Sequence, residues 1–369
     1  MMAALLIVLV LSLAFQIGYA VFLSHHTQRN VVFESPDPQG VSIIICAKNE
    51  AENLRSNLPR VLAQKYESAE GPLPWEVIVV DDGSTDETST ILRSFPDVRL
   101  RIISISKTAE RTLPGKKYAM AQGVAAAQYP WILCTDADCA PTGTDWLRGM
   151  TAPLESNDVS IGYGLLKGKP SLLSAFIQAE TLHAFIQSAA FANAGIPSSA
   201  VGRNMAFRKA FYQEQRHAAF DRLPSGDDDL LMHGPRPPRV AVVRGPGWMT
   251  ASQHPDSLGA YLRQKRRHLS TGKYYRPAVK ALLGGHALTH AAFWLSEILL
   301  ICFAPGRLVL AVLTGALLRW FCFFAAWRLN QKILEIRPRP SWLLFDIGWL
   351  LYNIVLSPYI LWKNKQAWK

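Results

Sequence analysis

The chain carries little charge for its length. Only 18% of its 369 residues are Asp, Glu, Lys or Arg, and 49% are apolar, whereas an ordinary soluble domain has about 25% charged residues. A disordered chain needs many charges and few apolar residues, so this composition excludes disorder. It favours a protein that has membrane segments in addition to a folded domain.

Cysteine is also scarce, and no Cys-x-x-Cys pair is present. The five cysteines stand at positions 46, 134, 139, 302 and 322, and two of them lie in apolar segments. This pattern predicts neither a disulfide framework nor a zinc site, and it favours buried, reduced thiols.

Acidic residues are outnumbered by basic ones, 28 against 39, which gives a net charge of +11. Such a balance suits nucleic acid, anionic lipid headgroups or a phosphorylated small substrate. The basic residues flank the apolar segments and a candidate phosphate site, so we do not expect nucleic acid as a partner.

Four apolar segments are each long enough to cross about 30 Å of hydrocarbon. The first lies within residues 1–24, and no Lys or Arg precedes Arg29. Since a secretory signal needs a positive start, we expect a membrane anchor instead. The other three segments lie within residues 281–362, which are expected to form three transmembrane or membrane-associated helices.

The positive-inside rule places the polar region between these segments in the cytoplasm. Three full C-terminal spans would put Lys363, Lys365 and Lys369 outside, which conflicts with that rule and favours one re-entrant or interfacial segment. Two charges inside the apolar segments, Arg319 and Asp346, are expected to pair between helices. The histidines of the apolar segments have no ligand spacing and are assigned no role.

The central region, residues 40–255, alternates β-branched runs with helical stretches. This alternation predicts an α/β fold with a mostly parallel sheet and helices on both faces. The expected strands are residues 41–46, 76–80, 101–105 and 131–135, and the expected helices lie near 50–65, 86–95 and 115–127. The apolar stretch 171–191 fits either a core helix or one that touches membrane or acceptor.

Polar residues follow three of the expected strands, where ligands bind in parallel sheets. Asp82 can accept hydrogen bonds from a nucleobase or ribose, and Asp136 and Asp138 offer oxygen ligands suited to Mg²⁺ or Mn²⁺. Lys116 follows Pro-Gly at a helix start, which attracts an anion. The rim is therefore expected to bind a diphosphate together with a divalent cation.

Two later segments add charged groups to this rim. Three consecutive acids, Asp227 to Asp229, start a helix, where they fit either helix capping or a general base whose pKa is raised by its neighbours. Residues 256–278 are expected to form an amphipathic interfacial helix that carries Gln264 and Arg267, and whose basic face could close over a diphosphate.

Together these motifs resemble the membrane-bound family 2 glycosyltransferases. The resemblance covers about residues 40–275 and rests on Asp-Asp-Gly-Ser-Thr-Asp at 81–86, Asp-x-Asp at 136–138, the late acidic motif and Gln-x-x-Arg at 264–267. It implies a GT-A fold, Rossmann-like and built on a mostly parallel sheet, flanked here by N- and C-terminal transmembrane helices.

The resemblance also implies roles for individual residues. The nucleotide and diphosphate would be bound by Glu50, Asp82, Lys116, Gln264 and Arg267, and the metal by Asp136 and Asp138. The catalytic base would be Asp228, with Asp227 and Asp229 as less favoured alternatives. Gly202 and Asn204 would line the acceptor pocket, together with His268, which replaces the Trp of the family's Gln-x-x-Arg-Trp motif.

The implied activity is inverting transfer of a sugar from a nucleotide-sugar donor, with uridine diphosphate as the expected nucleotide, to a lipid or lipid-linked acceptor. The enzyme would be an integral membrane protein that depends on Mg²⁺ or Mn²⁺, with its catalytic domain facing the cytoplasm. A processive polysaccharide synthase is the first alternative, although the missing Trp counts against it. A non-catalytic scaffold that binds nucleotide sugar or lipid is the second.

Overall fold

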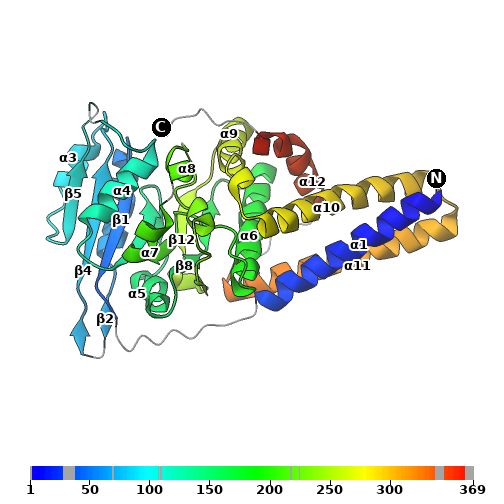
Figure 1. Ribbon diagram of the computed structural model, residues 1–369, viewed down its shortest axis with the longest axis horizontal. Coiled ribbons are helices and arrows are strands. Elements are labelled where there is room, and N and C mark those ends of the chain that lie inside the picture. Colours follow the sequence, from blue (N-terminus) through cyan, green and yellow to red (C-terminus); the bar gives the residue numbers. More distant parts are fainter. Residues whose placement is uncertain are drawn as a thin grey trace.

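The protein consists of an α/β domain and a bundle of long helices that projects from it (Figure 1). The computed structural model describes residues 2–27, 38–68, 70–106, 108, 110–216, 218–223, 225–336 and 345–361. All five cysteines lie in these ranges and are unpaired, as their spacing predicts.

The α/β domain is organised around a seven-stranded sheet in the order β11-β8-β10-β6-β1-β4-β5. β10 runs antiparallel to both of its neighbours, and the other pairings are parallel. The predicted mostly parallel sheet is confirmed, and so are its four predicted strands. The seven strands are β1 (Val41–Ala47), β4 (Trp75–Asp81), β5 (Leu100–Ser104), β6 (Trp131–Asp136), β8 (Val159–Gly162), β10 (Met205–Arg208) and β11 (Val240–Val243).

Helices cover both faces of this sheet, because alternate strand residues point to opposite sides. Ile43 of β1 belongs to one core cluster with Leu54 of α2, whereas Ile44 belongs to the other with Met120 of α4. α2, α3 and α5 contribute to the first cluster, and α4 and α6 contribute to the second. These helices are α2 (Ala51–Leu62), α3 (Thr88–Arg93), α4 (Lys116–Ala126), α5 (Trp146–Thr151) and α6 (Leu172–Asn193).

Shorter elements complete the domain. A three-stranded sheet contains β7 (Ala140–Pro141), β12 (Thr250–Gln253) and β9 (Gly164–Lys167), and a small hairpin pairs β2 (Glu67–Ser68) with β3 (Gly71–Pro72). The remaining helical segments are η1 (Ala152–Glu155), α7 (Lys209–Gln215), α8 (Ala218–Asp221), η2 (Leu230–His233), η3 (Pro246–Trp248), α9 (Leu258–Leu269) and η4 (Gly272–Tyr274).

Three described helices are long and apolar enough to cross a membrane: α1 (Met2–His26), α10 (Pro277–Phe303) and α11 (Gly306–Ile333). They lie side by side in the projecting bundle (Figure 1). The inner end of α1 is anchored in the domain, since the Gln187 amide of α6 donates to the Tyr19 hydroxyl at 2.9 Å. The bundle is therefore attached directly to the core helix α6.

Only part of the third C-terminal apolar segment lies among the described residues. α12 (Phe345–Leu356) has 12 residues, so it is about 18 Å long, and the 3₁₀ turn η6 (Ser357–Leu361) follows it. Pro358 explains this end, because a proline disfavours helical backbone in the residue before it. α12 lies beside α9 and α6, and the expectation of three transmembrane or membrane-associated helices, one of them re-entrant or interfacial, stays a prediction.

Close packing between α4 and the sheet leads to a stability prediction. A Cβ atom added to Gly123 would lie 2.7 Å from Cγ2 of Ile44 and 3.2 Å from Cγ2 of Val80. We expect Gly123→Ala to lower the free energy of unfolding by about 1–3 kcal/mol, the usual cost of overpacking, in thermal unfolding of the detergent-solubilised protein. Gly259→Ala is the control, since its nearest atom, Nη1 of Arg263, lies 3.5 Å away. Equal stability of the two variants would contradict this packing.

Candidate active site

The carboxyl ends of three neighbouring strands meet at one rim of the sheet. β1 lies between β4 and β6, and the register pairs Ala47 with Asp81 and Cys46 with Asp136. Asp82 and Asp138, which follow these strand ends, therefore reach the same rim. This is the edge at which parallel α/β sheets bind their ligands.

Asp82 is buried at this rim and carries a charged partner. Its side chain is fully covered, and the guanidinium of Arg111 donates to both carboxylate oxygens, at 2.6 and 3.1 Å. Arg111 comes from the segment between β5 and α4. On the other side of the rim, the Glu50 carboxylate accepts from the Asn53 amide at 2.5 Å.

Lys116 joins two acidic parts of the chain. It is the first residue of α4 and follows Gly115, whose φ of 57° is a left-handed conformation that favours glycine. Its Nζ lies 2.5 Å from Oδ1 of Asp136 and 3.4 Å from Oδ2 of Asp227. Burial lowers the pKa of Lys116, but the two carboxylates more than offset this and raise it well above its usual range.

Asp136 and Asp138 converge on one point. One oxygen from each carboxylate and the Cys139 sulfur all lie within 4.8 Å of one another. Burial and the charge of Asp138 raise the pKa of Cys139 well above its usual range, so the thiol stays protonated and donates to Asp138 at 3.3 Å. The two carboxylates therefore fit a hard divalent cation, while the neutral thiol does not add a ligand.

The two carboxylates have opposite pKa shifts. Burial raises the pKa of Asp136, but the Lys116 ammonium outweighs burial and lowers it overall, with smaller contributions from Arg203 and Arg267. Burial and the neighbouring Asp136 charge raise the pKa of Asp138. The charges of Arg203 and Arg267 thus act at the same rim as Lys116.

The three consecutive acids have three different surroundings. They follow Gly226, whose φ of 86° turns the chain sharply before them. Asp227 faces Lys116, as described above. Asp229 is held by structural hydrogen bonds, because its Oδ2 accepts from the hydroxyls of Thr271 and Tyr275 at 2.5 and 2.6 Å.

Asp228 lies between Asp227 and Asp229 in the sequence and contacts the backbone of the segment that precedes β10. Its Oδ2 accepts from the Gly202 N–H at 2.8 Å, and its Oδ1 accepts from the Asp229 N–H at 2.8 Å. Burial, followed by the charges of Asp227 and Asp229, raises the pKa of Asp228 to about 7. A carboxyl with this pKa can take up a proton near neutral pH.

The family comparison identifies the fold that carries this rim. The sequence profile described as Glycosyl transferase family 2 matches residues 42–214, which run from β1 to α7 and include the residues of the strand-end rim. Residues 42–214 are therefore similar to family 2 glycosyltransferase domains. The acids after Gly226 and the helix α9 lie beyond the matched residues.

Relatives by sequence cover a small part of the glycosyltransferase domain. A poly-beta-1,6-N-acetyl-D-glucosamine synthase of Staphylococcus aureus is 31% identical over 100 residues, which are 27% of this chain and 22% of that protein. The synthase of the same name from Staphylococcus epidermidis is 28% identical over 108 residues, 28% of this chain and 23% of that protein. The match thus spans about a fifth of the length of these curated relatives.

A solved structure resembles nearly the whole chain. A mannosyltransferase from Pyrobaculum calidifontis, solved in complex with GDP-Man and Mn²⁺, superposes with a TM-score of 0.56 and 17% identity, covering 95% of this chain and 99% of that chain. At this identity the likeness shows a shared fold, and it agrees with the predicted GT-A architecture.

Most of the residues singled out from sequence lie together at the rim of the glycosyltransferase domain. Gln264 and Arg267 lie one turn apart on α9, and the Arg267 charge acts on Asp136. His268 follows on the same helix and is exposed. Gly202 reaches the rim through its backbone N–H.

Asn204 differs from its expectation as an acceptor residue. Its side chain is buried and donates to the carbonyls of Tyr163 and Trp248, while its oxygen accepts from the Trp146 indole at 2.9 Å. These contacts place it in the interior, where it connects β10 to α5 and η3.

Sequence reasoning missed two arginines. Arg111 pairs with Asp82, and the signal for it was available, because β5 ends at the same rim as β4 and the segment after β5 contains this basic residue. Arg203 stands between two residues that were singled out, and its charge acts on Asp136 and Asp138.

The helix α9 is fixed to α6 by a buried ion pair. Nζ of Lys265 lies 2.6 Å from Oε2 of Glu180, and both side chains are largely covered. Tyr261 on the same helix is 1% exposed and packs against Ile177 of α6. The basic helix predicted to be interfacial is therefore seated on the glycosyltransferase domain and on α12, rather than lying alone.

The hydrogen bonds of Asp229 predict a structural role for this residue. We expect Asp229→Ala to lower the free energy of unfolding by about 1–3 kcal/mol, because the Tyr275 hydroxyl loses its acceptor and the Thr271 hydroxyl keeps only the His268 carbonyl. Thermal unfolding of the solubilised protein measures this. Asp221→Ala is the control, since its ion pair with Arg216 is partly exposed and contributes about 0–1 kcal/mol. Stability losses of the same size in both variants would count against the anchoring role.

Proposed function

We propose that the protein is an inverting glycosyltransferase that moves a sugar from a nucleotide-sugar donor to a lipid or lipid-linked acceptor at the membrane. The observation that carries this proposal is the position of Asp228. Its carboxyl, with a pKa of about 7, lies in the same acidic run that reaches Lys116 and, through Lys116, the Asp136 carboxylate. A proton acceptor and a diphosphate site are thus adjacent.

The donor would lie along the strand-end rim. Asp82 and Glu50 offer carboxylate acceptors for the nucleobase and ribose, and uridine is the nucleotide we expect. The donor diphosphate would be bound by Lys116 from α4 and by Gln264 and Arg267 from α9. This placement is supported by the charges of Lys116 and Arg267, which both lower the pKa of Asp136.

Asp136 and Asp138 would hold Mg²⁺ or Mn²⁺, for which their converging oxygens are suited. When bound, such an ion neutralises charge that develops on the departing diphosphate. Lys116 contributes positive charge at the same place from the chain itself, and Arg267 contributes more from α9.

The transfer step follows from these positions. Asp228 takes the proton of the acceptor hydroxyl, whose oxygen forms a bond to the anomeric carbon of the sugar. The bond from that carbon to the diphosphate oxygen breaks on the opposite side, so the configuration inverts. The nucleoside diphosphate leaves with the electron pair and is stabilised by Lys116 and Arg267. The Gly202 N–H orients Asp228, and the exposed His268 lies where an acceptor could approach.

The helix bundle supports a membrane acceptor and a cytoplasmic active site. With α1, α10 and α11 as the three spans, the glycosyltransferase domain and the chain after α11 fall on one side of the membrane. Arg328 and Lys332, near the end of α11, would then share that side with the basic helix α9, in agreement with the positive-inside rule.

A processive polysaccharide synthase is the second candidate. The observation in its favour is the name of the relatives, which are synthases of poly-beta-1,6-N-acetyl-D-glucosamine. Against it, His268 stands where processive enzymes of the resembled family have Trp, and few helices are available to build a channel.

Replacing the proposed base gives the first test of mechanism. We expect Asp228→Asn to lower the rate of sugar transfer by a factor of about 10²–10⁴, the usual contribution of a general base. Its thermal unfolding should stay at the wild-type level or above, because a costly buried charge is removed. Wild-type transfer rates in this variant would exclude Asp228 as the base.

The raised pKa of Asp228 also predicts a pH profile. Below about pH 7 the carboxyl is protonated and cannot accept a proton, so kcat/KM should fall as pH falls through 7 and should level off above it. Asp227→Asn removes a neighbouring negative charge, which lowers the pKa of Asp228, so its acidic limb should shift to lower pH. An acidic limb that stays in place in this variant would point to a different titrating group.

The function itself is tested with membranes that contain the protein and a panel of labelled nucleotide sugars, with Mn²⁺, with Mg²⁺ and with chelator. We expect metal-dependent label in the organic phase, and none with Asp228→Asn. High-mass label in the aqueous or insoluble fraction would support the polysaccharide synthase. Absence of transfer with every donor, despite nucleotide binding, would contradict both enzyme proposals.

A further inference from the structure

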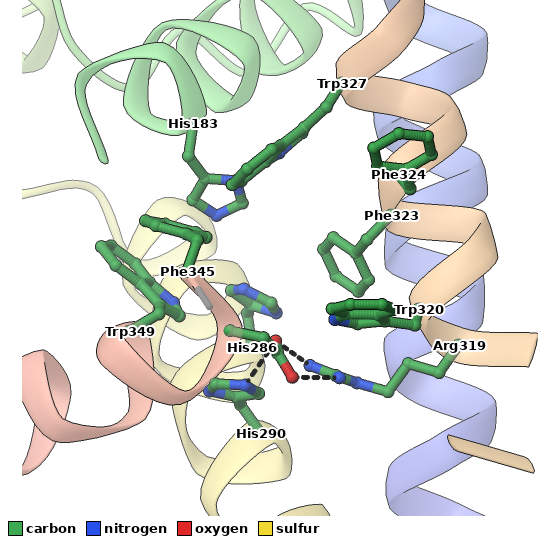
Figure 2. A pocket seen from close by; sticks show the side chains of 11 residues that line it. His183, His286, His290, Arg319, Trp320, Phe323, Phe324, Trp327, Phe345 and Trp349 are labelled. Atoms are coloured by element: carbon green, nitrogen blue, oxygen red, sulfur yellow. Dashed lines mark hydrogen bonds and ion pairs between the residues drawn. The ribbon is translucent and has the colours of Figure 1, made fainter. Parts of the chain in front are cut away.

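A cavity lies at the base of the helix bundle, away from the strand-end rim. It is partly open and lies between α6, α10, α11 and α12 (Figure 2). The residues that line it are His183, His286, His290, Arg319, Trp320, Phe323, Phe324, Trp327, Phe345, Asp346 and Trp349. The glycosyltransferase chemistry described above uses none of them.

One end of the cavity is formed by a polar network in which charge is balanced. Arg319 of α11 donates to both oxygens of Asp346 on α12, at 2.7 and 2.8 Å, as the sequence predicts for this pair. His290 of α10 lies 3.0 Å from the same carboxylate. Gln16 of α1 contacts the network as well, 3.4 Å from Arg319. The Asp346 carboxylate and the Arg319 guanidinium, the one acidic and the one guanidinium group among the lining residues, therefore neutralise each other.

Two imidazole nitrogens among the lining residues have no hydrogen-bond partner in the described part of the chain, one on His183 away from the polar network and one on His290 within it. Nε2 of His183 and Nδ1 of His290 are buried, and neither finds a hydrogen-bond partner among the described residues. Figure 2 shows the His183 ring directed into the space bordered by Trp327 and Phe345. Burial lowers the pKa of His183 to about 3, so this imidazole is neutral. The cavity therefore offers uncharged hydrogen-bonding groups within aromatic walls.

Two lining residues of the cavity belong to the exposed apolar side of α11, which would face lipid if α11 spans the bilayer. Trp320 and Phe324 line the cavity and are 39% and 45% exposed. They share α11 with the exposed Leu317 and Phe321, part of the apolar surface that a spanning helix presents to hydrocarbon. A molecule would therefore enter from the acyl region of the bilayer.

We propose that this cavity binds the apolar body of a neutral membrane lipid, and that this lipid is the sugar acceptor. The inference rests on the proposed function. A lipid is favoured by the aromatic walls and by the two lining residues on the exposed apolar side of α11. A neutral one is favoured because Asp346 already balances Arg319, which leaves no unpaired charge among the lining residues. A carbonyl or a second hydroxyl of the lipid, distinct from the hydroxyl that accepts the sugar, could also bond to the Nε2 of His183.

The core helix α6 connects this cavity to the diphosphate site. His183 lies three residues after Glu180, which is ion-paired to Lys265 of α9 at 2.6 Å. Lys265 is two residues before Arg267. An acceptor seated against His183 would thus contact the helix that also fixes the position of the basic helix over the donor.

Direct binding is tested on the full-length protein in lipid nanodiscs with a long-chain alcohol that carries a diazirine and an alkyne handle. After illumination, we expect labelled peptides from α6, α11 and α12. Phe323→Trp, which fills the cavity, should lower that labelling about tenfold, the scale on which one mis-sized group alters binding in an apolar pocket. Phe321→Trp on the same helix is the matched control, because residue 321 is 69% exposed and lies outside the cavity.

Two outcomes of this experiment would overturn the proposal. One is equal labelling of the wild type and both variants, and the other is labelling confined to the lipid-exposed faces of the bundle. A diazirine lipid with a phosphate headgroup serves as a further arm, and stronger cavity labelling by this anionic probe would also overturn the proposal of a neutral ligand.

Kinetics separate this proposal from the proposed function. Hydrolysis of the donor to free sugar needs the diphosphate site but no acceptor, so Phe323→Trp should leave the hydrolysis rate unchanged and raise the KM for the lipid acceptor about tenfold. If the wild type transfers sugar and the variant has an unchanged KM for the acceptor, the cavity is not the acceptor site. That result would leave the proposed function standing. Absence of both transfer and donor hydrolysis in the wild type would instead refute the proposed function.

Discussion

The structure of the active site depends on the contact of one ammonium with two carboxylates. Lys116 lies 2.5 Å from Asp136 and 3.4 Å from Asp227, and these acids come from chain segments about ninety residues apart. Without a cation between them, the strand-end acids and the acidic run after Gly226 would repel each other. Lys116 thus holds Asp136, one of the two proposed metal ligands, and the acidic run with the proposed base within one site, while the Asp228 carboxyl titrates near neutral pH.

This arrangement explains why the acids of the run are not interchangeable. Asp227 gains a cationic partner, Asp229 gains two hydroxyls, and Asp228 gains only backbone N–H groups. Burial and neighbouring carboxylates raise a carboxyl pKa, and a cation lowers it overall only where its effect is the larger, as at Asp136, which Lys116 contacts directly. The same physical rule therefore gives Asp136 a low pKa and Asp228 a high one within a single site.

The strand-end residues could be predicted because parallel strands bring their carboxyl ends to one rim whatever the details of packing. The distinction between Asp228 and Asp229 could not, since it depends on Thr271 and Tyr275, more than forty residues away. For the same reason the histidines of α10 had no assigned role. Their partners belong to α6, α11 and α12, and only packing of the bundle brings these helices together.

The polar network inside the bundle is not explained by stability. Replacing a buried ion pair with well-packed apolar residues is often neutral or stabilising, because both charges lose their hydration. The pair Arg319–Asp346 instead fixes α12 against α11 at one depth and closes the inner end of the cavity with groups that carry no net charge. α6 then lies between this cavity and α9, with His183 on one side and Glu180 on the other. A single core helix therefore sets the position of the cavity and of the basic helix beside the donor site.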